Sequence, residues 1–514
     1  MHMKKLPIGI QTFSEIIEDN HCYVDKTPLI HKLVNEGKYY FLSRPRRFGK
    51  SLLISTIKSA FLGQQSLFKN LYLEKNWDWS IQHPVLQISF GGGVVKDREN
   101  LDIMFEDILR DIQQQHKITL HNKSIQGRFA ELIREIHQKY QQKVVILVDE
   151  YDKPILDNIT HPELATEIRE SLKNIYSVIK DNDEHTRFIF LTGVSKFNKV
   201  SLFSGLNNLT DITLNKHYAT ICGYTEADIK KIFKDYIKDV DFKKLRQWYN
   251  GYNFLGEKIY NPYDILLYLN SGEYSNYWFE TGSPSFLIKL IQQKQYNSFD
   301  IDHVETSQEM LSSFDIEQIQ LETLLFQTGY LTIDSVERIG NENFYKLRYP
   351  NHEVKSSLNN HILNYLTDNP IAKAKNQQLL YHAMKGIHLD ELKNIFQAFF
   401  SSIPHQWYRK NQLANYEGYY ASIFYCYFTA LGLDTIAEDT TNHGQIDLTV
   451  MLKKQVFIIE FKVVNKNSPE NTAIQQIKNN GYAEKYRQHP VVYLIGIEFN
   501  HNERNITQFD WEKA

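Results

Sequence analysis

Short apolar runs alternate with helical stretches over the first two hundred residues. Residues 144–148 form a continuous β-branched and apolar run, which is typical of a strand buried on both faces. The apolar runs predict strands at 39–42, 85–90, 144–148 and 188–191. The stretches between them predict helices at 101–115, 129–140 and 168–179. Strands that alternate with helices in this way favour a mainly parallel α/β sheet.

The pattern changes near residue 224, where helices with many aromatic residues begin. A helix at 321–326, strands at 331–337 and 344–349, and a turn at Gly340-Asn341 together resemble a winged-helix module. The tail predicts a helix at 416–431, strands at 446–452 and 456–463, a helix at 474–486 and a strand at 491–497. We therefore expect the tail to form a small α/β unit with its own core.

The length of the chain sets the number of domains. With 514 residues, the chain is long enough for about three domains that each bury a core. The changes in pattern predict domains at 1–222, 223–375 and 376–514. Lys and Arg total 58 against 61 Asp and Glu, so the net charge is −3. This balance excludes a uniformly basic surface for nucleic acid, although it allows a local basic groove.

Cysteine usage and hydropathy point to the cytoplasm. Cys22, Cys222 and Cys426 lie far apart and form neither a disulfide framework nor a Cys-x-x-Cys metal pair. The start of the chain lacks the apolar segment of a signal peptide. The longest apolar-rich run, residues 423–433, is about half the length of a membrane span. We expect a soluble cytoplasmic protein that does not bind a membrane.

The first chemical motif is Arg44-Pro45-Arg46-Arg47-Phe48-Gly49-Lys50-Ser51, between a predicted strand and a predicted helix. A phosphate loop reads G-x-x-x-x-G-K-[ST], so the sequence departs from it at Arg44. Gly49 would let the backbone approach a phosphate, and Lys50 would reach the β- and γ-phosphates of a nucleotide. Ser51 would offer its hydroxyl to Mg²⁺. The alternative is a basic turn with a solvated lysine.

A second motif follows the strand at 144–148. Asp149 stands where a Walker B aspartate assists Mg²⁺, and Glu150 is placed to orient or deprotonate the attacking water. Acidic residues also end strands simply because they face solvent, and this alternative stays open. The order of the two motifs within one alternating α/β region favours an ATP site.

Four further side chains are candidates near this site. Ser195 and Lys196 follow the strand at 188–191, where they would sense the γ-phosphate or form an ordinary polar loop. Arg46 and Arg47 have three interpretations: they would stabilise the transferred charge, contact a neighbouring subunit of a homo-oligomer, or face solvent.

The tail carries a second cluster of candidate groups. Glu460 and Lys462 alternate along one strand and share a face, while Phe461 faces the core. Asp447 lies on the preceding strand of the hairpin. Two carboxylates can hold Mg²⁺, and Lys462 can position water or offset charge on a scissile phosphate. The triplet [DE]-x-K also occurs elsewhere, so the paired strands select this copy; a salt bridge between Glu460 and Lys462 is the alternative.

These motifs together resemble the bacterial AAA-ATPase-like family whose members carry a C-terminal PD-(D/E)XK nuclease-superfamily domain. The family shares the arginine at the start of the phosphate loop, so Arg44 counts as a family trait. The resemblance rests on segments spread over nearly the whole chain: 23–27, 44–51, 149–154, 192–197, 203–208, 248–252, 261–262, 327–331, 444–447, 460–462, 476–477 and 482–486.

The resemblance implies a fold and a set of roles. The fold is α/β: a P-loop NTPase parallel sheet, a helical lid with a winged-helix-like middle region, and a small α/β PD-(D/E)XK nuclease-like domain. In the first domain, phosphate and magnesium would be bound by Lys50 and Ser51, with Asp149 and Glu150 assisting the metal and the water. In the tail, the implied metal ligands are Asp447, Glu460 and a supporting Glu417, the catalytic lysine is Lys462, and Gln476 matches a glutamine of the family.

The expected activity follows from the two domains. The cofactors would be ATP with Mg²⁺ at the first site and Mg²⁺, or alternatively Mn²⁺, at the second. The macromolecular partner would be nucleic acid, with DNA favoured over RNA as the substrate of phosphodiester hydrolysis. Two alternatives stay open. One is a signalling ATPase whose tail binds nucleic acid without cutting it, and the other is a nucleotide-dependent scaffold in which Arg44 marks a degenerate loop.

Overall fold

The computed structural model divides the chain into two compact units. The first comprises Met1–Gly282 and Val304–Asn351, and the second Ser283–His303 and His352–Ala514. The structure describes residues 3–197, 208–281, 304–312, 320–366, 370–402, 417–464, 472–500 and 503–514, with Leu202, Leu206, Leu287, Leu290, Ile291 and Ile301. Among the segments that carry the resemblance, Phe203, Ser204, Gly205 and Asn207 lie outside the described residues.

The first unit is built on a parallel sheet of five strands. Because β4 lies between β1 and β3, the carboxyl ends of these three strands meet at one edge of the sheet, where α/β folds bind ligands. The strand order is β2 (Val85–Ser89), β3 (Val144–Asp149), β4 (Thr186–Gly193), β1 (Tyr39–Ser43) and β5 (Thr210–Asp211). The predicted parallel α/β sheet is confirmed, and the short strand β5 is an addition.

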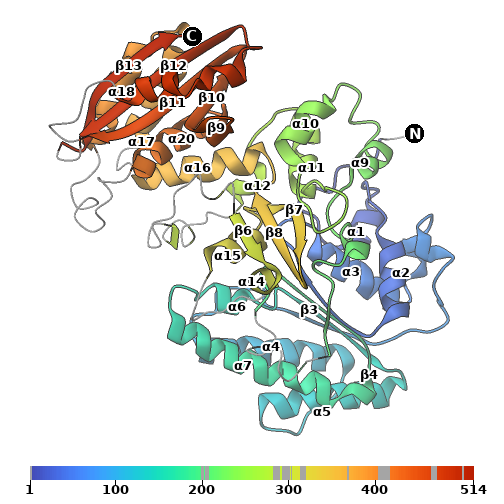
Figure 1. Ribbon diagram of the computed structural model, residues 1–514. Helices are drawn as coiled ribbons and strands as arrows, with labels where there is room; N and C mark the ends of the chain where they lie inside the picture. Colours follow the sequence, from blue (N-terminus) through green and yellow to red (C-terminus); the bar gives the residue numbers. More distant parts are fainter. Residues whose placement is uncertain are drawn as a thin grey trace. The chain divides into compact units, whose positions relative to one another are not determined.

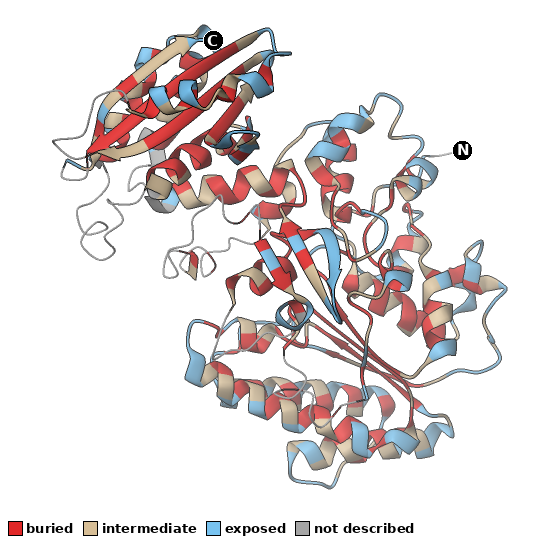
Figure 2. Ribbon diagram, in the orientation of Figure 1, coloured by how far each residue is buried: buried red, intermediate tan, exposed pale blue. Residues whose placement is uncertain are grey.

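Helices cover both faces of this sheet (Figure 1). Helices α4, α5 and α7 lie on one face and α3 on the other, with α1 packed against α3. In Figure 2 the strands are almost wholly buried, whereas these helices expose their outer sides. The bounds are α1 (Phe13–Glu18), α2 (Thr27–Glu36), α3 (Lys50–Phe61), α4 (Arg98–His116), α5 (Ile125–Tyr140), α6 (Lys153–Leu156) and α7 (Pro162–Asp181).

The rest of the first unit combines aromatic helices with a small antiparallel sheet. Helices α9 (Glu226–Ile232), α10 (Phe242–Tyr249), α11 (Pro262–Ser271) and α12 (Tyr277–Glu280) carry most of a core that also includes Cys22 and Val24. Two helices and three strands follow: β6 (Val304–Ser307), α14 (Gln308–Ser312), α15 (Leu321–Thr328), β7 (Thr332–Ile339) and β8 (Glu342–Arg348). The predicted helix and hairpin are confirmed, with β6 added in the order β6-β8-β7. The winged-helix assignment and the limits of the middle domain stay predictions.

The second unit is built on a mixed sheet of order β13-β12-β11-β10-β9. Its strands are β9 (Asp434–Thr441), β10 (Gly444–Leu452), β11 (Gln455–Val464), β12 (Val491–Asn500) and β13 (Asn505–Lys513). Its helices are α16 (His352–Leu366), α17 (Pro370–Gly386), α18 (Leu389–Ser402), α20 (Glu417–Ala430) and α21 (Thr472–Asn479). Of these elements, the sequence of the tail predicted the β10–β11 hairpin, α20, β12 and the start of α21, and it did not predict the others.

The predicted helix at 474–486 is wrong in its second half. Helix α21 ends at Asn479, and Gly481 then adopts a left-handed φ of 60°, a conformation that ends helices. The chain continues as a short 3₁₀ turn, η8 (Tyr482–Tyr486). The helical spacing of apolar residues continued across this break because Tyr482 and Tyr486 also pack into the core beside Ile477.

The alternation of β11 places its side chains in two separate cores. Val456 and Ile458 pack toward α21 and η8, whereas Ile459 and Phe461 pack in the core that holds α18 and α20. Glu460 therefore lies on the α21 face of the sheet, although it is only 1% exposed.

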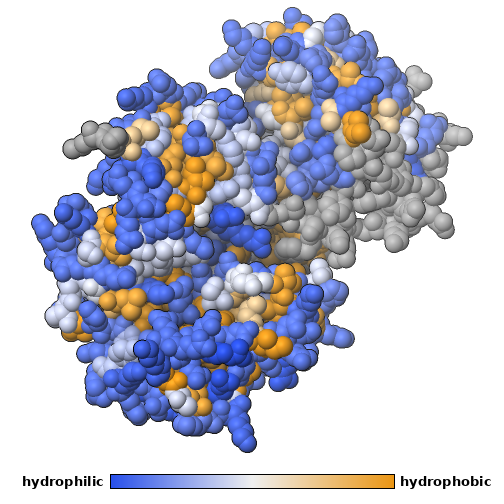
Figure 3. All heavy atoms as spheres, turned by 180° about the vertical axis from the view of Figure 1, so that it is seen from behind, coloured by the Kyte–Doolittle hydropathy of each residue, from blue (hydrophilic) through white to orange (hydrophobic). Residues whose placement is uncertain are grey.

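Within the described part of the chain, no helix combines the length and apolar character that crossing a bilayer requires. The face seen in Figure 3 is mostly hydrophilic, and its apolar residues gather in small separate patches.

Candidate active sites

The loop between β1 and α3 borders a cavity of about 410 Å³, which we call the phosphate cavity after the predicted motif on its rim. Gly49 has a left-handed φ of 91°, and a Cβ at this position would meet no atom within 4 Å. Its backbone is therefore open to the cavity, as close approach to a phosphate requires. Of the residues predicted for ATP, those that line the cavity are Arg46, Arg47, Gly49, Lys50, Ser51 and Glu150.

Lys50 is a buried cation that donates to backbone carbonyls of its own loop. Its Nζ donates hydrogen bonds to the carbonyl oxygens of Arg44 at 2.8 Å and Pro45 at 2.9 Å. Burial lowers the pKa of Lys50, and the nearby charge of Asp149 opposes this shift. A phosphate in the cavity would give this ammonium a charged acceptor, which binds it more strongly than a carbonyl does.

The structure explains why an arginine can begin this loop. Arg44 is fully buried, and its guanidinium donates to the carbonyl oxygens of Ser43, Thr213 and Tyr218. It also stacks on Phe254, with 3.8 Å between the guanidinium carbon and the ring centroid. Arg44 is not among the residues with positive φ, so this position has no need of glycine. The side chain braces the loop instead of lining the cavity.

The end of β3 carries the two predicted acids in different settings. Asp149 is buried, and the Thr192 hydroxyl at the tip of β4 donates to it at 2.7 Å. Glu150 lines the cavity, and its φ of 53° is unusual for a residue other than glycine. Burial raises the pKa of Glu150, Asp149 raises it further, and Lys50 opposes the shift. A carboxylate with a raised pKa is better suited to accept a proton from water.

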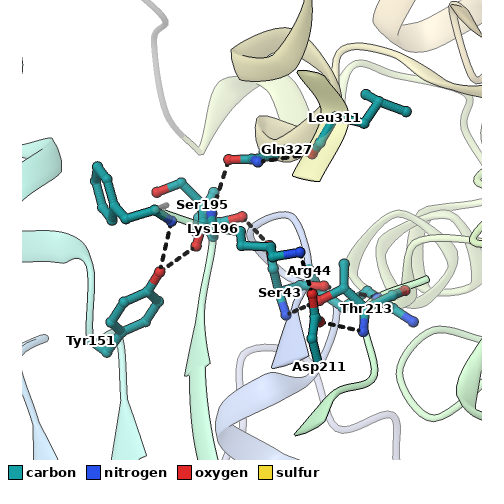
Figure 4. Close-up of polar contacts among 11 residues, drawn as sticks. Ser43, Arg44, Tyr151, Ser195, Lys196, Asp211, Thr213, Leu311 and Gln327 are labelled. Atoms are coloured by element: carbon teal, nitrogen blue, oxygen red, sulfur yellow. Dashed lines mark hydrogen bonds and ion pairs between the residues drawn. The ribbon is translucent and has the colours of Figure 1, made fainter. Parts of the chain in front are cut away.

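Ser195 does not face the cavity. It is fully buried, and its hydroxyl and its backbone N–H both donate to the Asp152 carboxylate at 2.6 Å. Burial raises the pKa of Asp152, and the bonds from Ser195 oppose that shift. Figure 4 shows Ser195 beside Tyr151, whose hydroxyl donates to the Ser195 carbonyl oxygen. Sequence reasoning assigned no role to Asp152 or Thr192, although both belong to motifs that carry the resemblance.

Lys196 faces away from the phosphate cavity. Its ammonium pairs with Asp211 at 2.5 Å, and its backbone N–H donates to the side-chain oxygen of Gln327 at 2.9 Å. These groups line a second cavity of about 390 Å³, which Arg44 also borders.

Two segments that sequence reasoning missed complete the phosphate cavity. The N-terminal segment contributes Pro7, Gly9, Ile10 and Gln11, and the helical region contributes Tyr224, Pro262, Tyr263, Leu266 and Thr281. Arg47 lies over the Tyr263 ring at 4.9 Å, and the Trp278 indole donates to the Arg46 carbonyl at 3.1 Å. Both arginines therefore contact the aromatic helices. Both are exposed, and exposure to solvent was one of the interpretations drawn from the sequence.

In the second unit, the β10–β11 hairpin brings Asp447 and Glu460 together. The ladder pairs Leu448 with Ile459, so Asp447 and Glu460 are the next residues on the two strands. Asp447 accepts a hydrogen bond from the backbone N–H of Phe461 at 2.7 Å. Burial raises the pKa of both carboxyl groups; Asp447 raises that of Glu460 further, and Lys462 opposes both shifts. Lys462 thus offsets only part of the rise in pKa of these two neighbouring acids.

Three more predicted residues surround this pair. Lys462 forms an ion pair with Glu417 at 3.6 Å, and Glu417 also accepts from the backbone N–H of Val463. The Gln476 amide donates to one oxygen of Glu460. The other Glu460 oxygen is buried and has no hydrogen-bond partner among the described residues.

The donor set at the hairpin fits a divalent cation. Among the described residues, no group of three or more His, Cys, Asp or Glu side chains converges to hold a metal. Mg²⁺, however, is commonly bound through one or two carboxylates, with water and substrate phosphate as the other ligands. Asp447 and the unpartnered oxygen of Glu460 supply such a pair, and Glu417 instead holds Lys462.

The comparisons with known proteins agree with this organisation. Residues 7–203 match the family described as predicted AAA-ATPase, and residues 415–509 match the PD-(D/E)XK nuclease superfamily. The chain is also 49% identical, over 511 residues and 99% of both chains, to a protein of Azotobacter chroococcum mcd 1 named "Uncharacterized protein in vnfD 5'region". The chain belongs to the AAA-ATPase-like family with a C-terminal PD-(D/E)XK nuclease-superfamily domain. The resemblance found in the sequence is thereby confirmed.

Proposed function

We propose that the chain hydrolyses ATP at the first site and cleaves phosphodiester bonds, in DNA rather than RNA, at the second. One arrangement carries the proposal: Asp447 and Glu460 lie on neighbouring strands beside Lys462, and one Glu460 oxygen has no partner among the described residues. Two neighbouring carboxyl groups whose pKa values stay raised even with Lys462 nearby are a costly arrangement for a purely structural site.

At the first site, Mg²⁺ bound with ATP would neutralise charge on the β- and γ-phosphates. Ser51 and Asp149 are the residues that would hold it. Lys50 would exchange its loop carbonyls for phosphate oxygens. Glu150, with its raised pKa, would orient the attacking water and accept its proton.

At the second site, Mg²⁺ or Mn²⁺ would polarise the scissile phosphate as a Lewis acid. Asp447 and Glu460 would hold the cation, and Gln476 fixes the direction of Glu460. Lys462 would offset negative charge on the phosphate, and Glu417 holds its ammonium near the hairpin.

A second candidate function is nucleic-acid binding without cleavage, in a signalling or scaffold ATPase. It is favoured by the ion pair in which Glu417 binds Lys462, because this pair engages the ammonium of the candidate catalytic lysine. The two functions differ in one observable property, which is metal-dependent cutting of DNA.

We also propose a cytoplasmic location and self-association. Cys22, Cys222 and Cys426 are all buried as thiols that form no disulfide, a state suited to a reducing compartment. Arg46 and Arg47 are exposed beside the phosphate cavity, where they would reach a neighbouring subunit. Mass photometry with and without ATP would test the association.

The first experiment is nucleotide binding by the purified chain. Lys50→Ala should abolish measurable ATP binding, because losing a charge-assisted contact to phosphate costs on the order of 1.5–3 kcal/mol or more. Lys58→Ala is the matched control, since Lys58 lies on the same helix and bonds Gln87 outside the cavity. Equal ATP affinity in the two variants would remove Lys50 from the site. Steady-state ATP turnover and nicking of plasmid DNA with Mg²⁺ or Mn²⁺ then test the two activities separately.

A further inference from the structure

Helix α15 ends against the two loops that follow β1 and β4. We call residues 327–330, Gln327-Thr328-Gly329-Tyr330, the helix-end segment. It belongs to a motif that the sequence singled out, and the proposed function gives it no role. It leads through Leu331 directly into the hairpin of β7 and β8.

The first contact is made by Gln327. Its side-chain oxygen accepts a hydrogen bond from the backbone N–H of Lys196, and its amide nitrogen lies 3.4 Å from the Leu311 carbonyl oxygen (Figure 4). Gln327 is only 5% exposed. Ser195, the residue before Lys196, donates hydrogen bonds to the Asp152 carboxylate. Asp152 and Gln327 therefore fix consecutive residues of the loop after β4, and Asp152 lies two residues beyond Glu150.

The second contact is made by Gly329 against the phosphate loop. Gly329 has a φ of 94°, and a Cβ there would lie 2.7 Å from Cβ of Pro45 and 3.3 Å from the Trp278 ring. The carbonyl of Pro45 in turn accepts a hydrogen bond from Lys50. A side chain at Gly329 would thus press on a residue that holds the phosphate-binding lysine.

The third contact runs through aromatic rings. Tyr330 packs on Trp278 with 5.3 Å between ring centroids, and the Trp278 indole donates to the Arg46 carbonyl. The helix-end segment therefore contacts the loop after β4 directly, and the phosphate loop both directly and through Trp278.

We propose that the helix-end segment positions the two loops for ATP hydrolysis and transmits the nucleotide state to the β7–β8 hairpin. The inference rests on the proposed ATPase activity. In-line attack on the γ-phosphate needs Lys50 and Glu150 in one fixed geometry, and these side chains belong to different loops. The segment contacts the phosphate loop directly, and it reaches the loop that carries Glu150 through Lys196, Ser195 and Asp152, so it would hold that geometry. Any loop movement on loss of the γ-phosphate also displaces the hairpin that follows the segment.

The first test removes the contact to Lys196. Gln327→Met keeps the volume but loses the acceptor, and should lower kcat roughly 10- to 100-fold while changing the Kd for ATP less than about threefold. Thr328→Val is the matched control, because among the described residues the Thr328 hydroxyl bonds the carbonyl oxygens of Leu324 and Leu325 in its own helix and none in either loop. It should keep the kcat of the parent chain.

The second test uses two glycines that end helices in the same conformation. Gly329→Ala and Gly272→Ala both place a side chain at a left-handed φ, but only the first meets Pro45, since nothing lies within 4 Å at Gly272. The unfolding temperature should therefore fall in both variants. The kcat of Gly329→Ala should fall below the kcat of Gly272→Ala.

The deciding readout is hydrogen exchange of backbone amides in residues 332–348, with ATP-γ-S and with ADP. We expect the two nucleotides to give different exchange in the parent chain and in Thr328→Val, and the same exchange in Gln327→Met despite bound nucleotide. A parent hairpin that exchanges identically with both nucleotides, or a Gln327→Met variant with parental kcat and parental exchange, would overturn the inference. A parent chain that binds ATP but never hydrolyses it would overturn the proposed function instead, and the exchange comparison would still decide transmission. A parent that binds neither nucleotide would overturn both.

Discussion

The side-chain amide of Gln476 donates a hydrogen bond to one carboxylate oxygen of Glu460, and the other oxygen of Glu460 has no partner among the described residues. Gln476 lies on α21 and Glu460 on β11, so the helix sets the direction of the strand's acid. Groups that orient a metal ligand in this way commonly govern metal affinity.

Gln476→Ala should therefore weaken metal-dependent cleavage about 10- to 100-fold, mainly through a higher Mg²⁺ requirement. The control is Gln475→Ala, which changes the same residue type at an exposed neighbouring position. Cleavage rates measured across a Mg²⁺ titration check this prediction. Identical titrations for the two variants would show that Gln476 does not position Glu460.

On acidification, kcat for ATP hydrolysis should begin to decline at a higher pH than the ordinary pKa of a glutamate would give. Glu150 acts as a base only when it is ionised, and burial together with Asp149 raises its pKa above the ordinary value of 4.5. As the pH falls through this raised pKa, the carboxylate becomes protonated and kcat declines. Glu150→Gln should bind ATP normally, be slower by roughly 10²–10⁴-fold and lack this acid limb. A kcat–pH profile of the parent that stays flat down to pH 4.5 would contradict the assignment.

Two adjacent glycines after β2 test the position of Glu150 by sterics alone. A Cβ at Gly91 would lie 2.9 Å from Oε2 of Glu150, whereas a Cβ at Gly92 would meet nothing within 4 Å. Gly91→Ala should lower kcat about tenfold or more by displacing the carboxylate, and Gly92→Ala should not. Steady-state turnover at saturating ATP measures both. Equal losses would point to the flexibility of the loop instead of contact with Glu150.

The sequence predicted those strands that are continuous apolar runs, such as β3, because burial on both faces leaves a clear pattern. It missed β9, whose residues include Asp434, Glu438 and Asp439. Asp439 is tolerated inside the fold only because Thr449, Lys485 and Tyr486 bond it. These partners come from other elements, so the local sequence pattern around β9 does not predict them.

The candidate sites divide in the same way. Lys50, Glu150 and Glu460 could be chosen from motif and strand position; the first two line the same cavity, and Glu460 lies on the strand paired with that of Asp447. Ser195 was chosen for its place after β4, but its hydroxyl bonds Asp152, and Thr192 is the side chain that reaches Asp149. Which polar group at a strand end faces a neighbour depends on packing between strands, which sequence spacing does not encode.

The most direct test of the account is cleavage of a labelled DNA duplex in Mg²⁺, with and without ATP, by four proteins. They are the parent, Lys50→Ala, Lys462→Ala and the exposed hairpin control Lys454→Ala. A labelled RNA duplex serves as the second substrate. We predict cutting of DNA by every protein except Lys462→Ala, with or without ATP, so that Lys50→Ala cuts like the parent. Cleavage by Lys462→Ala at the rate of the parent would contradict the account.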